Sequence, residues 1–383
     1  MSTSETTGLR PEIRMMLALA DLELGDERVE YCRSSIADQA RSIDWGFFVD
    51  QAARHRILPL VSKNIIRHGL HLSENGAYLI PYHWLYPFVY HGNESRNQGL
   101  AAEFGSVIRA LNAANIAYAI RKGPVLGEWL YGDAAIRPVN DLDVLVERGN
   151  VAAASAVLNT LGYTQGRLSA YGKGIEPFSR RTQVFWHMNV DNELPYLKLA
   201  GQKYVETYIV DICFDISKTF SESSVGLGEL LERRIPLGLC GEQGFALALT
   251  DQFIDLCANL HMEATALYYV ADGGDVEILK FLDIALSCRQ LSAEGRWAEV
   301  RERVHALGAL ESVYYALHYT ALLYPDSVPP EELVALRPVD CRYLDEYGAF
   351  EGKPQQWRQP FLHRLFDPRR PDEVQQSTSI PRL

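Results

Sequence analysis

The stretch that decides the fold is RPVNDLDVLVE, residues 137–147. From Asp141 onward polar and apolar residues alternate, and side chains that alternate in this way point to opposite faces of a β-strand. One face carries apolar side chains and can be buried, whereas the other carries the carboxylates of Asp141 and Asp143. The stretch therefore predicts a strand that packs on a core and presents an acidic edge.

Asp141 and Asp143 lie about 7 Å apart along such a strand, measured between their Cα atoms. Two like charges this close repel, and each raises the pKa of the other. A cation bound between them would remove the repulsion, and Mg²⁺ prefers carboxylate and phosphate oxygens. The pair therefore indicates a magnesium site, although an isolated Asp-x-Asp is also compatible with a solvated strand edge or a cap.

A candidate phosphate site lies upstream of this strand. Residues 116–120 (IAYAI) predict a short buried strand, Gly123 permits a tight turn, and Pro124 suits the first position of a helix. Backbone amides at the start of a helix attract phosphate, and Lys122 adds a positive charge there. Taken alone, Lys122 favours a solvated surface position.

A second strand is predicted at residues 205–216 (VETYIVDICFDI), where apolar residues again alternate with polar ones. If this strand is an antiparallel neighbour of the first, either Asp211 or Asp215 lies beside the Asp141–Asp143 pair. About 13 Å separates these two residues along a strand, so both can hardly serve one metal cluster. Three carboxylates in one place would suit two metals, one orienting a triphosphate and one helping to ionise an attacking hydroxyl.

In combination, these motifs resemble those of the nucleotidyltransferase fold shared with DNA polymerase β. The chain is most similar, over about residues 43–290, to a poorly characterised bacterial family of nucleotidyltransferases. Two features depart from the family pattern: no serine adjoins Gly123, and Cys213 and Phe214 stand where relatives carry histidine and tryptophan. The shared motifs are Lys122-Gly123, Arg137-Pro138, Asp141-x-Asp143, Leu161-Gly162-Tyr163 and Val210-Asp211-Ile212.

The resemblance implies a metal-dependent nucleotidyltransferase. Asp141, Asp143 and Asp211 would be the catalytic residues and would hold Mg²⁺ or Mn²⁺, with Asp211 preferred to Asp215 because it fits the Val-Asp-hydrophobic motif. The reaction would move a nucleoside monophosphate from ATP, or from another nucleoside triphosphate, to a small-molecule or protein acceptor. Pyrophosphate would be the second product.

Further residues are expected to contact the nucleotide. Lys122 and the amides around Gly123 would hold phosphate, and Arg137 would either contact phosphate or order the loop before the metal strand. By the same resemblance, Lys280 or Asp283 of a C-terminal helical lobe would face the nucleotide or the acceptor. A charged pair on a solvated helix face is the alternative for these last two residues.

Two other functions remain compatible with these motifs. The same site could activate a carboxylate as an acyl-adenylate and pass it to an amine, which would make the protein an ATP-dependent amide ligase of a biosynthetic pathway. Alternatively, the fold could be a catalytically silent binding module. A cluster of aspartates without a function would cost stability through repulsion, which argues against the silent alternative.

The expected fold is of the α+β class, with a polymerase-β-like core of a short mixed sheet and helices. The N-terminal region is expected to contain an amphipathic helix at 45–57, a break or start at Pro59 and a long helix at 87–115. Within the core we expect a helix at 151–161, a loop at 166–176 and a middle strand at 183–190. The expected regions are an N-terminal helical region (1–115), the core (116–235), a C-terminal helical lobe (236–345) and an irregular, partly mobile tail (346–383).

Bulk composition narrows the class of protein. The 383 residues include 37 basic and 49 acidic ones, and the net charge of −12 argues against a general nucleic-acid binder. The six cysteines are scattered and form no Cys-x-x-Cys pair, so neither a zinc site nor a disulfide framework is indicated. The first residues lack the pattern of a signal peptide, and no apolar run reaches transmembrane length. We therefore expect a cytoplasmic enzyme that does not bind membranes.

Overall fold

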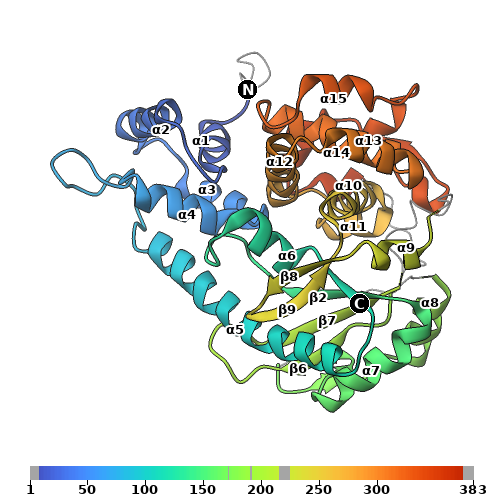
Figure 1. Cartoon of the computed structure of the whole chain (residues 1–383). Helices are drawn as coiled ribbons and strands as arrows, with labels where there is room; N and C mark the ends of the chain where they lie inside the picture. The colour runs from blue at the N-terminus through green and yellow to red at the C-terminus, as the bar shows by residue number, and fades with distance from the viewer. Residues whose placement is uncertain (1–7, 171, 190–191, 215–224, 374–383) are drawn as a thin grey trace.

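The computed structural model describes residues 8–170, 172–189, 192–214 and 225–373. Within these residues the centre is a seven-stranded mixed sheet in the order β3-β6-β7-β2-β1-β9-β8. Figure 1 shows the N-terminal and the C-terminal helices together on one side of the sheet, and the long helix α5 running across it. A mixed sheet surrounded by many helices is consistent with the predicted α+β class. The strands are β1 (Tyr118–Arg121), β2 (Asp141–Val146), β3 (Thr164–Gln165), β6 (Tyr196–Leu199), β7 (Thr207–Cys213), β8 (Ile235–Leu239) and β9 (Glu242–Ala246).

The two strands that carry the acidic motifs are neighbours, but not in the predicted direction. β2 and β7 pair in parallel, and Asp143 lies directly opposite Asp211. The expected antiparallel pairing is therefore wrong. The reason lies between the two strands in the sequence: β6 forms the antiparallel pair with β7, so the chain reverses once more and β7 runs in the direction of β2.

The apolar face of β2 is buried as predicted, against helices α5 (Leu85–Ala113) and α7 (Val151–Thr160). On the opposite face, Leu145 of β2 and Cys213 of β7 are buried in a second core, which is formed mainly by the N-terminal and C-terminal helices. Residues i and i+2 of a strand share a face. The side chains of Asp143 and Asp211 therefore belong to the face that is covered by these helices.

The N-terminal region is helical, as predicted. Helix α4 carries Pro59 in its first turn, where the missing N–H has no intrahelical partner to lose. Helix α5 leads directly into β1, which confirms the long helix predicted for residues 87–115. The remaining helices of this region are α1 (Pro11–Leu19), α2 (Asp26–Gln39), α3 (Trp45–Arg54) and α4 (Leu58–Arg67).

Two segments of the core differ from their predictions. The segment 183–190, predicted as a middle strand, lies in helix α8 (Arg180–Asn189) over its described residues. It cannot join the sheet beside β7, because β6 already occupies that position. The segment 166–176, predicted as a loop, contains a short antiparallel pair between β4 (Arg167–Leu168) and β5 (Ile175–Glu176).

The sheet continues past residue 240, where the chain was expected to be helical. β8 and β9 form a hairpin whose two-residue turn, Cys240 and Gly241, has positive φ angles of 55° and 78°. Positive φ at both central residues is the geometry of the turns that suit the twist of a hairpin. β9 also pairs with β1, so residues up to Ala246 belong to the same sheet. The hairpin escaped prediction because its strands contain proline and glycine, which strands usually avoid.

The C-terminal region is built around helix α10 (Leu249–Thr265), most of whose side chains are buried. It packs against helices on several sides and against the edge of the sheet that holds the aspartates (Figure 1). Within the described residues no helix is long and apolar enough to cross a membrane. The other helices of this region are α9 (Leu227–Glu232), α11 (Leu267–Asp272), α12 (Ile278–Ala293), α13 (Trp297–Ala306), α14 (Leu310–Leu323) and α15 (Pro330–Ala335).

The described part of the tail, residues 346–373, contains regular structure, whereas the tail was expected to be irregular. It forms helix α16 (Phe361–Phe366), and Leu365 within it is almost fully buried. Further on, Arg370 is buried and pairs with Asp275, with 2.6 Å between Nη2 and Oδ1. The prolines of the tail limit its regular structure, but they do not prevent its apolar side chains from packing on the helical core.

Candidate active site

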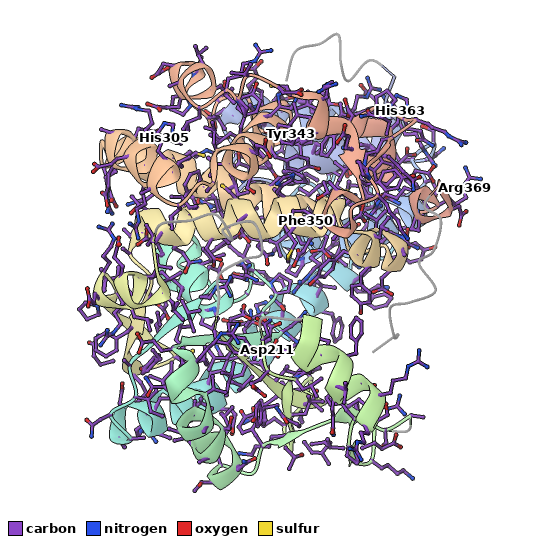
Figure 2. The ribbon with its side chains drawn as sticks, turned by 90° about the vertical axis from the view of Figure 1, so that its right-hand side faces the viewer. Asp211, His305, Tyr343, Phe350, His363 and Arg369 are labelled. Carbon is purple, nitrogen blue, oxygen red and sulfur yellow. The ribbon has the colours of Figure 1, made fainter. Side chains whose placement is uncertain are left out.

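Three aspartates meet on one face of the sheet. Asp143 and Asp211 are register partners on β2 and β7, and Asp141 lies two residues before Asp143 on the same face. All three side chains are half-buried. Figure 2 shows Asp211 in the middle of the molecule, between the strands and the C-terminal helices. Asp215, the alternative third carboxylate, lies outside the described residues.

The electrostatics of the cluster reflect crowding of like charges. Burial and then the charge of Asp143 raise the pKa of Asp141 to about 6. Burial and then the charges of Asp143 and Asp141 raise the pKa of Asp211 well above its usual range. Both shifts mean that ionising all three carboxylates together is unfavourable without a compensating cation.

The donor set fits a hard divalent cation. Three carboxylates on adjacent strands supply only oxygen, which Mg²⁺ and Mn²⁺ prefer. Among the described residues, no three His, Cys, Asp or Glu side chains already stand in the arrangement of a metal cage. Binding of a cation by the three aspartates would therefore require their side chains to turn toward one another.

Lys122 lies at the same edge of the sheet. It does not occupy the solvated surface position that was the alternative prediction for it. Its Nζ donates a 2.7 Å hydrogen bond to Oδ1 of Asn259 on α10 and lies 3.8 Å from Oδ2 of Asp143. Burial alone would lower the pKa of Lys122, but the attraction of Asp143 raises it above its ordinary value. The lysine therefore brings a stable positive charge to the aspartate cluster.

The turn between β1 and the next helix differs from its prediction. The residue with positive φ is Lys122, at 49°, whereas Gly123 is the first residue of helix α6 (Gly123–Leu126). A Cβ added to Gly123 would meet the backbone oxygen of Asp141 at 3.4 Å, an ordinary contact distance. Gly123 is therefore adjacent to the acidic strand, but the unusual backbone belongs to the lysine, and such strain is typical of functional positions.

Arg137 makes its hydrogen bonds in the protein interior, although its positive charge also stabilises the ionised form of Asp141. Its Nε and Nη2 donate to both carboxylate oxygens of Asp283 on α12, at 3.0 and 2.8 Å. The hydroxyl of Tyr131 donates to the same carboxylate at 2.7 Å. Of the two roles predicted for Arg137, this geometry fits the ordering of the loop before β2, and it also shows that Asp283 is not on a solvated helix face.

Lys280 is likewise held by internal partners. Its Nζ lies 2.7 Å from Oε2 of Glu263 on α10 and donates to the backbone oxygen of Gly274 at 2.8 Å. Glu263 in turn hydrogen-bonds to Asn259, the partner of Lys122. Lys280 therefore connects to the aspartate edge only through a chain of side chains, and the structure does not bring it to the aspartates directly.

Two arginines that the sequence did not single out reach the segment before Asp141. Nη2 of Arg56, just after α3, donates to the backbone oxygen of Pro138 at 3.3 Å. Arg96 of α5 donates through Nη1 to the backbone oxygen of Val139 and through Nη2 to Oδ1 of Asn140 at 3.1 Å. Both arginines are far from Asp141 in the sequence and carry no local motif, so only the tertiary contact identifies them.

A buried ion pair joins the same edge to α10. Arg121, the last residue of β1 and the register partner of Asp143, donates to both carboxylate oxygens of Asp255. The two side chains are 4% and 0% exposed. This pair fixes α10 against the strand that carries the acidic motif.

Comparison with known families agrees with this geometry. Residues 41–325 match the model of a family described as uncharacterised nucleotidyltransferase. The match covers well over half of the 383 residues, so the chain belongs to this family of nucleotidyltransferases. No curated protein matches the chain.

Proposed function

We propose that the protein is a metal-dependent nucleotidyltransferase that moves a nucleoside monophosphate from ATP, or another nucleoside triphosphate, to a small-molecule or protein acceptor. The observation that carries this proposal is the parallel pairing of β2 and β7, which sets Asp143 opposite Asp211 and beside Asp141. In this proposal the sheet and its covering helices, up to Ala246, form a catalytic core of the polymerase-β type.

The proposed reaction is a displacement at the α-phosphorus of the nucleotide. An acceptor oxygen forms a bond to this phosphorus, the bond to the bridging oxygen breaks, and pyrophosphate leaves. Mg²⁺ or Mn²⁺ held by Asp141, Asp143 and Asp211 would neutralise phosphate charge and favour ionisation of the acceptor hydroxyl. Asp211, which lies opposite Asp143 in the sheet, would accept the proton of the acceptor hydroxyl.

Lys122 contributes positive charge to the same site. Its ammonium group is held by Asn259 and Asp143 at distances that leave the group next to the aspartates. In the proposal it stabilises the negative charge that the phosphates carry during transfer, which is the main task of a protein in this chemistry. Arg137 supports the site indirectly, because its pairing with Asp283 orders the loop that leads into β2.

The electrostatics favour a catalytic protein over a silent binding module. The raised pKa values of Asp141 and Asp211 report burial of the carboxylates and then a repulsion between them, and both effects destabilise the metal-free protein. A protein without need of the cluster would gain stability by losing one of its carboxylates. The retained repulsion therefore supports a function that requires all three.

The proposal is tested by replacing Asp143 with asparagine. We expect Asp143→Asn to lower the rate of pyrophosphate release from nucleoside triphosphates by about 10² or more, because the change removes one metal-binding charge at the centre of the cluster. The measurement is Mg²⁺-dependent binding of the four ribonucleoside triphosphates by calorimetry, followed by pyrophosphate release in the presence of candidate acceptors.

A matched control is Asp50→Asn, which makes the same chemical change at an exposed carboxylate that pairs with Arg54 on the surface. It should leave binding and turnover unchanged, and the circular dichroism spectrum should be intact in both variants. Full turnover by Asp143→Asn, or binding that does not depend on Mg²⁺ in the wild type, would remove the metal role from the proposal.

A further inference from the structure

The cationic side chains that were expected to hold the triphosphate mostly pair with acidic or polar side chains of the protein itself. Arg137 is paired through two hydrogen bonds with Asp283, and Lys280 with Glu263. Lys122 is shared between Asn259 and Asp143. A triphosphate carries more negative charge than one divalent cation and one lysine neutralise, so further cations are needed at the aspartate edge.

Arg56 and Arg96 lie next to the start of the strand that carries Asp141 and Asp143. Their guanidinium groups contact three consecutive residues, 138–140, that immediately precede Asp141. Both arginines are half-buried, and the positive charge of Arg56 stabilises the ionised form of Asp141. Two guanidinium groups therefore lie beside the carboxylate cluster, and they come from the N-terminal region, which the predicted site did not include.

The two arginines are also close to each other. Burial, followed by the positive charge of Arg56, lowers the pKa of Arg96. Two neighbouring cations repel, just as the aspartates do, and an anion between them would relieve the repulsion. Each guanidinium has five N–H donors, and the contacts made within the described residues use only some of them. Each group therefore has N–H donors beyond those that make these contacts.

The backbone at Arg56 supports a role for its side chain. The residue follows the end of α3 with a φ of 57°, a left-handed conformation in which helices usually place glycine. Holding a non-glycine residue there costs of order 1 kcal/mol. Its acidic partner, Oε2 of Glu277, is 3.9 Å away, so this distant ion pair offsets little of that cost. The side chain of Arg56 is therefore retained at a position where its backbone is strained.

We propose that Arg56 and Arg96 bind the β- and γ-phosphates of the nucleotide, next to the metal site at Asp141. This inference rests on the proposed nucleotidyl transfer and adds the N-terminal region to the active site. Bidentate contacts from arginine suit phosphate oxygens. The pyrophosphate group would then lie between the N-terminal helices and the acidic strand.

The decisive variant is Arg56→Gly, because a structural role and a ligand role predict different effects on stability. Glycine adopts a φ of 57° without strain, and this gain offsets the loss of the 3.3 Å hydrogen bond to Pro138, so the variant should melt at about the same temperature as the wild type. Calorimetry at fixed Mg²⁺ concentration should show ATP binding weakened about tenfold or more, since each charged hydrogen bond to phosphate contributes strongly. AMP, which lacks both terminal phosphates, should bind as it does to the wild type.

Two further variants complete the test. Arg96→Gln should weaken ATP binding in the same way, and Arg54→Ala is the control, because Arg54 pairs with Asp50 on the exposed side of α3. Inorganic tripolyphosphate serves as a probe that needs no nucleoside pocket. The inference is overturned if Arg56→Gly binds ATP and tripolyphosphate normally, or if it lowers the melting temperature and weakens ATP and AMP equally.

These measurements separate the inference from the proposed function. Mg²⁺-dependent ATP binding that is lost in Asp143→Asn but kept in Arg56→Gly would leave the proposed function standing and overturn the inference. Tripolyphosphate binding that depends on Arg56, in a wild-type protein that transfers no nucleotide to any acceptor, would support the anion site and argue against the function. A wild-type protein that binds neither ATP nor tripolyphosphate would overturn both.

Discussion

Single residues of the site differ in how their charges are compensated. Arg137 and Lys280 are neutralised inside the protein by Asp283 and Glu263. The carboxylate of Asp141, in contrast, has like charges close by, and burial together with Asp143 raises its pKa to about 6. The residues whose charges are not fully compensated are the ones whose charges a bound metal or phosphate would neutralise.

The raised pKa of Asp141 predicts a pH dependence of stability. An ordinary aspartate ionises near pH 4, and Asp141 in the folded protein ionises near pH 6. The protonated form of Asp141 therefore stabilises the folded state. This stabilisation is fully present below about pH 4 and is lost as the pH rises through 6. The loss amounts to about 3 kcal/mol, from about 1.4 kcal/mol for each pKa unit.

We therefore expect metal-free Asp141→Asn to be more stable than the wild type at pH 7, by up to about 3 kcal/mol. The two proteins should have nearly equal free energies of unfolding near pH 4. Denaturant titrations in the presence of a chelator between pH 4 and pH 8 provide the measurement, and added Mg²⁺ should reduce the difference at pH 7. A difference that does not vary with pH would contradict the assignment.

At the scale of elements, helix α10 is the structural partner of the acidic strand. Asp255, Asn259 and Glu263 are spaced four residues apart and so lie on one face of the helix. They contact in turn Arg121 at the end of β1, Lys122 beside it and Lys280 on α12. One helical face therefore holds Arg121 and Lys122 beside the aspartates.

This arrangement predicts that breaking the contact between Asp255 and Arg121 lowers the free energy of unfolding by a large amount. Asp255→Asn removes the charge that compensates the buried guanidinium of Arg121, and we expect the free energy of unfolding to fall by about 3 to 5 kcal/mol. The control is Glu242→Gln, which removes the partner of the exposed Arg109 and should cost less than about 1 kcal/mol. Equal small effects in chemical denaturation would show that α10 is not held by this pair.

The sequence predicted several elements because their patterns are local. The alternation in β2 and the proline in the first turn of α4 each identified an element, and the long helix α5 was also predicted. The hairpin of β8 and β9 and the helical state of residues 180–189 were missed. The hairpin was missed because its strands contain proline and glycine, which strands usually avoid. The segment 180–189 is kept out of the sheet by β6, which takes the place beside β7, and no short window of sequence shows this.

At the scale of the whole molecule, segments from the N-terminal region and from the tail meet near the aspartate cluster. His55, which precedes Arg56, contacts the ring of Phe366 in α16 and accepts a backbone hydrogen bond from Leu279 of α12. The tail also holds the connection between α11 and α12 through the buried pair of Arg370 and Asp275. The tail is therefore part of the support for the N-terminal arginines rather than an independent appendage.

The two adjacent arginines of the tail test this assignment. Arg370→Ala leaves the buried carboxylate of Asp275 without its partner and should destabilise the protein by about 3 to 5 kcal/mol. Arg369→Ala, one residue earlier and 82% exposed, should change stability by less than about 0.5 kcal/mol. Thermal and chemical unfolding of both variants give the comparison, and similar values for the two would show that the tail does not support the fold.

The sequence by itself determined the acidic strand, its buried face and the kinship to nucleotidyltransferases, because period-two alternation and a short motif are properties of neighbouring residues. Only the tertiary structure decided that β7 runs parallel to β2, which sets Asp143 opposite Asp211. It also decided which lysine and arginine side chains pair with carboxylates inside the protein. Only the tertiary contacts show that Arg56 and Arg96 reach the edge of the sheet that holds the aspartates. Strand direction and charge pairing depend on contacts between segments far apart in the chain. Patterns among neighbouring residues do not predict such contacts.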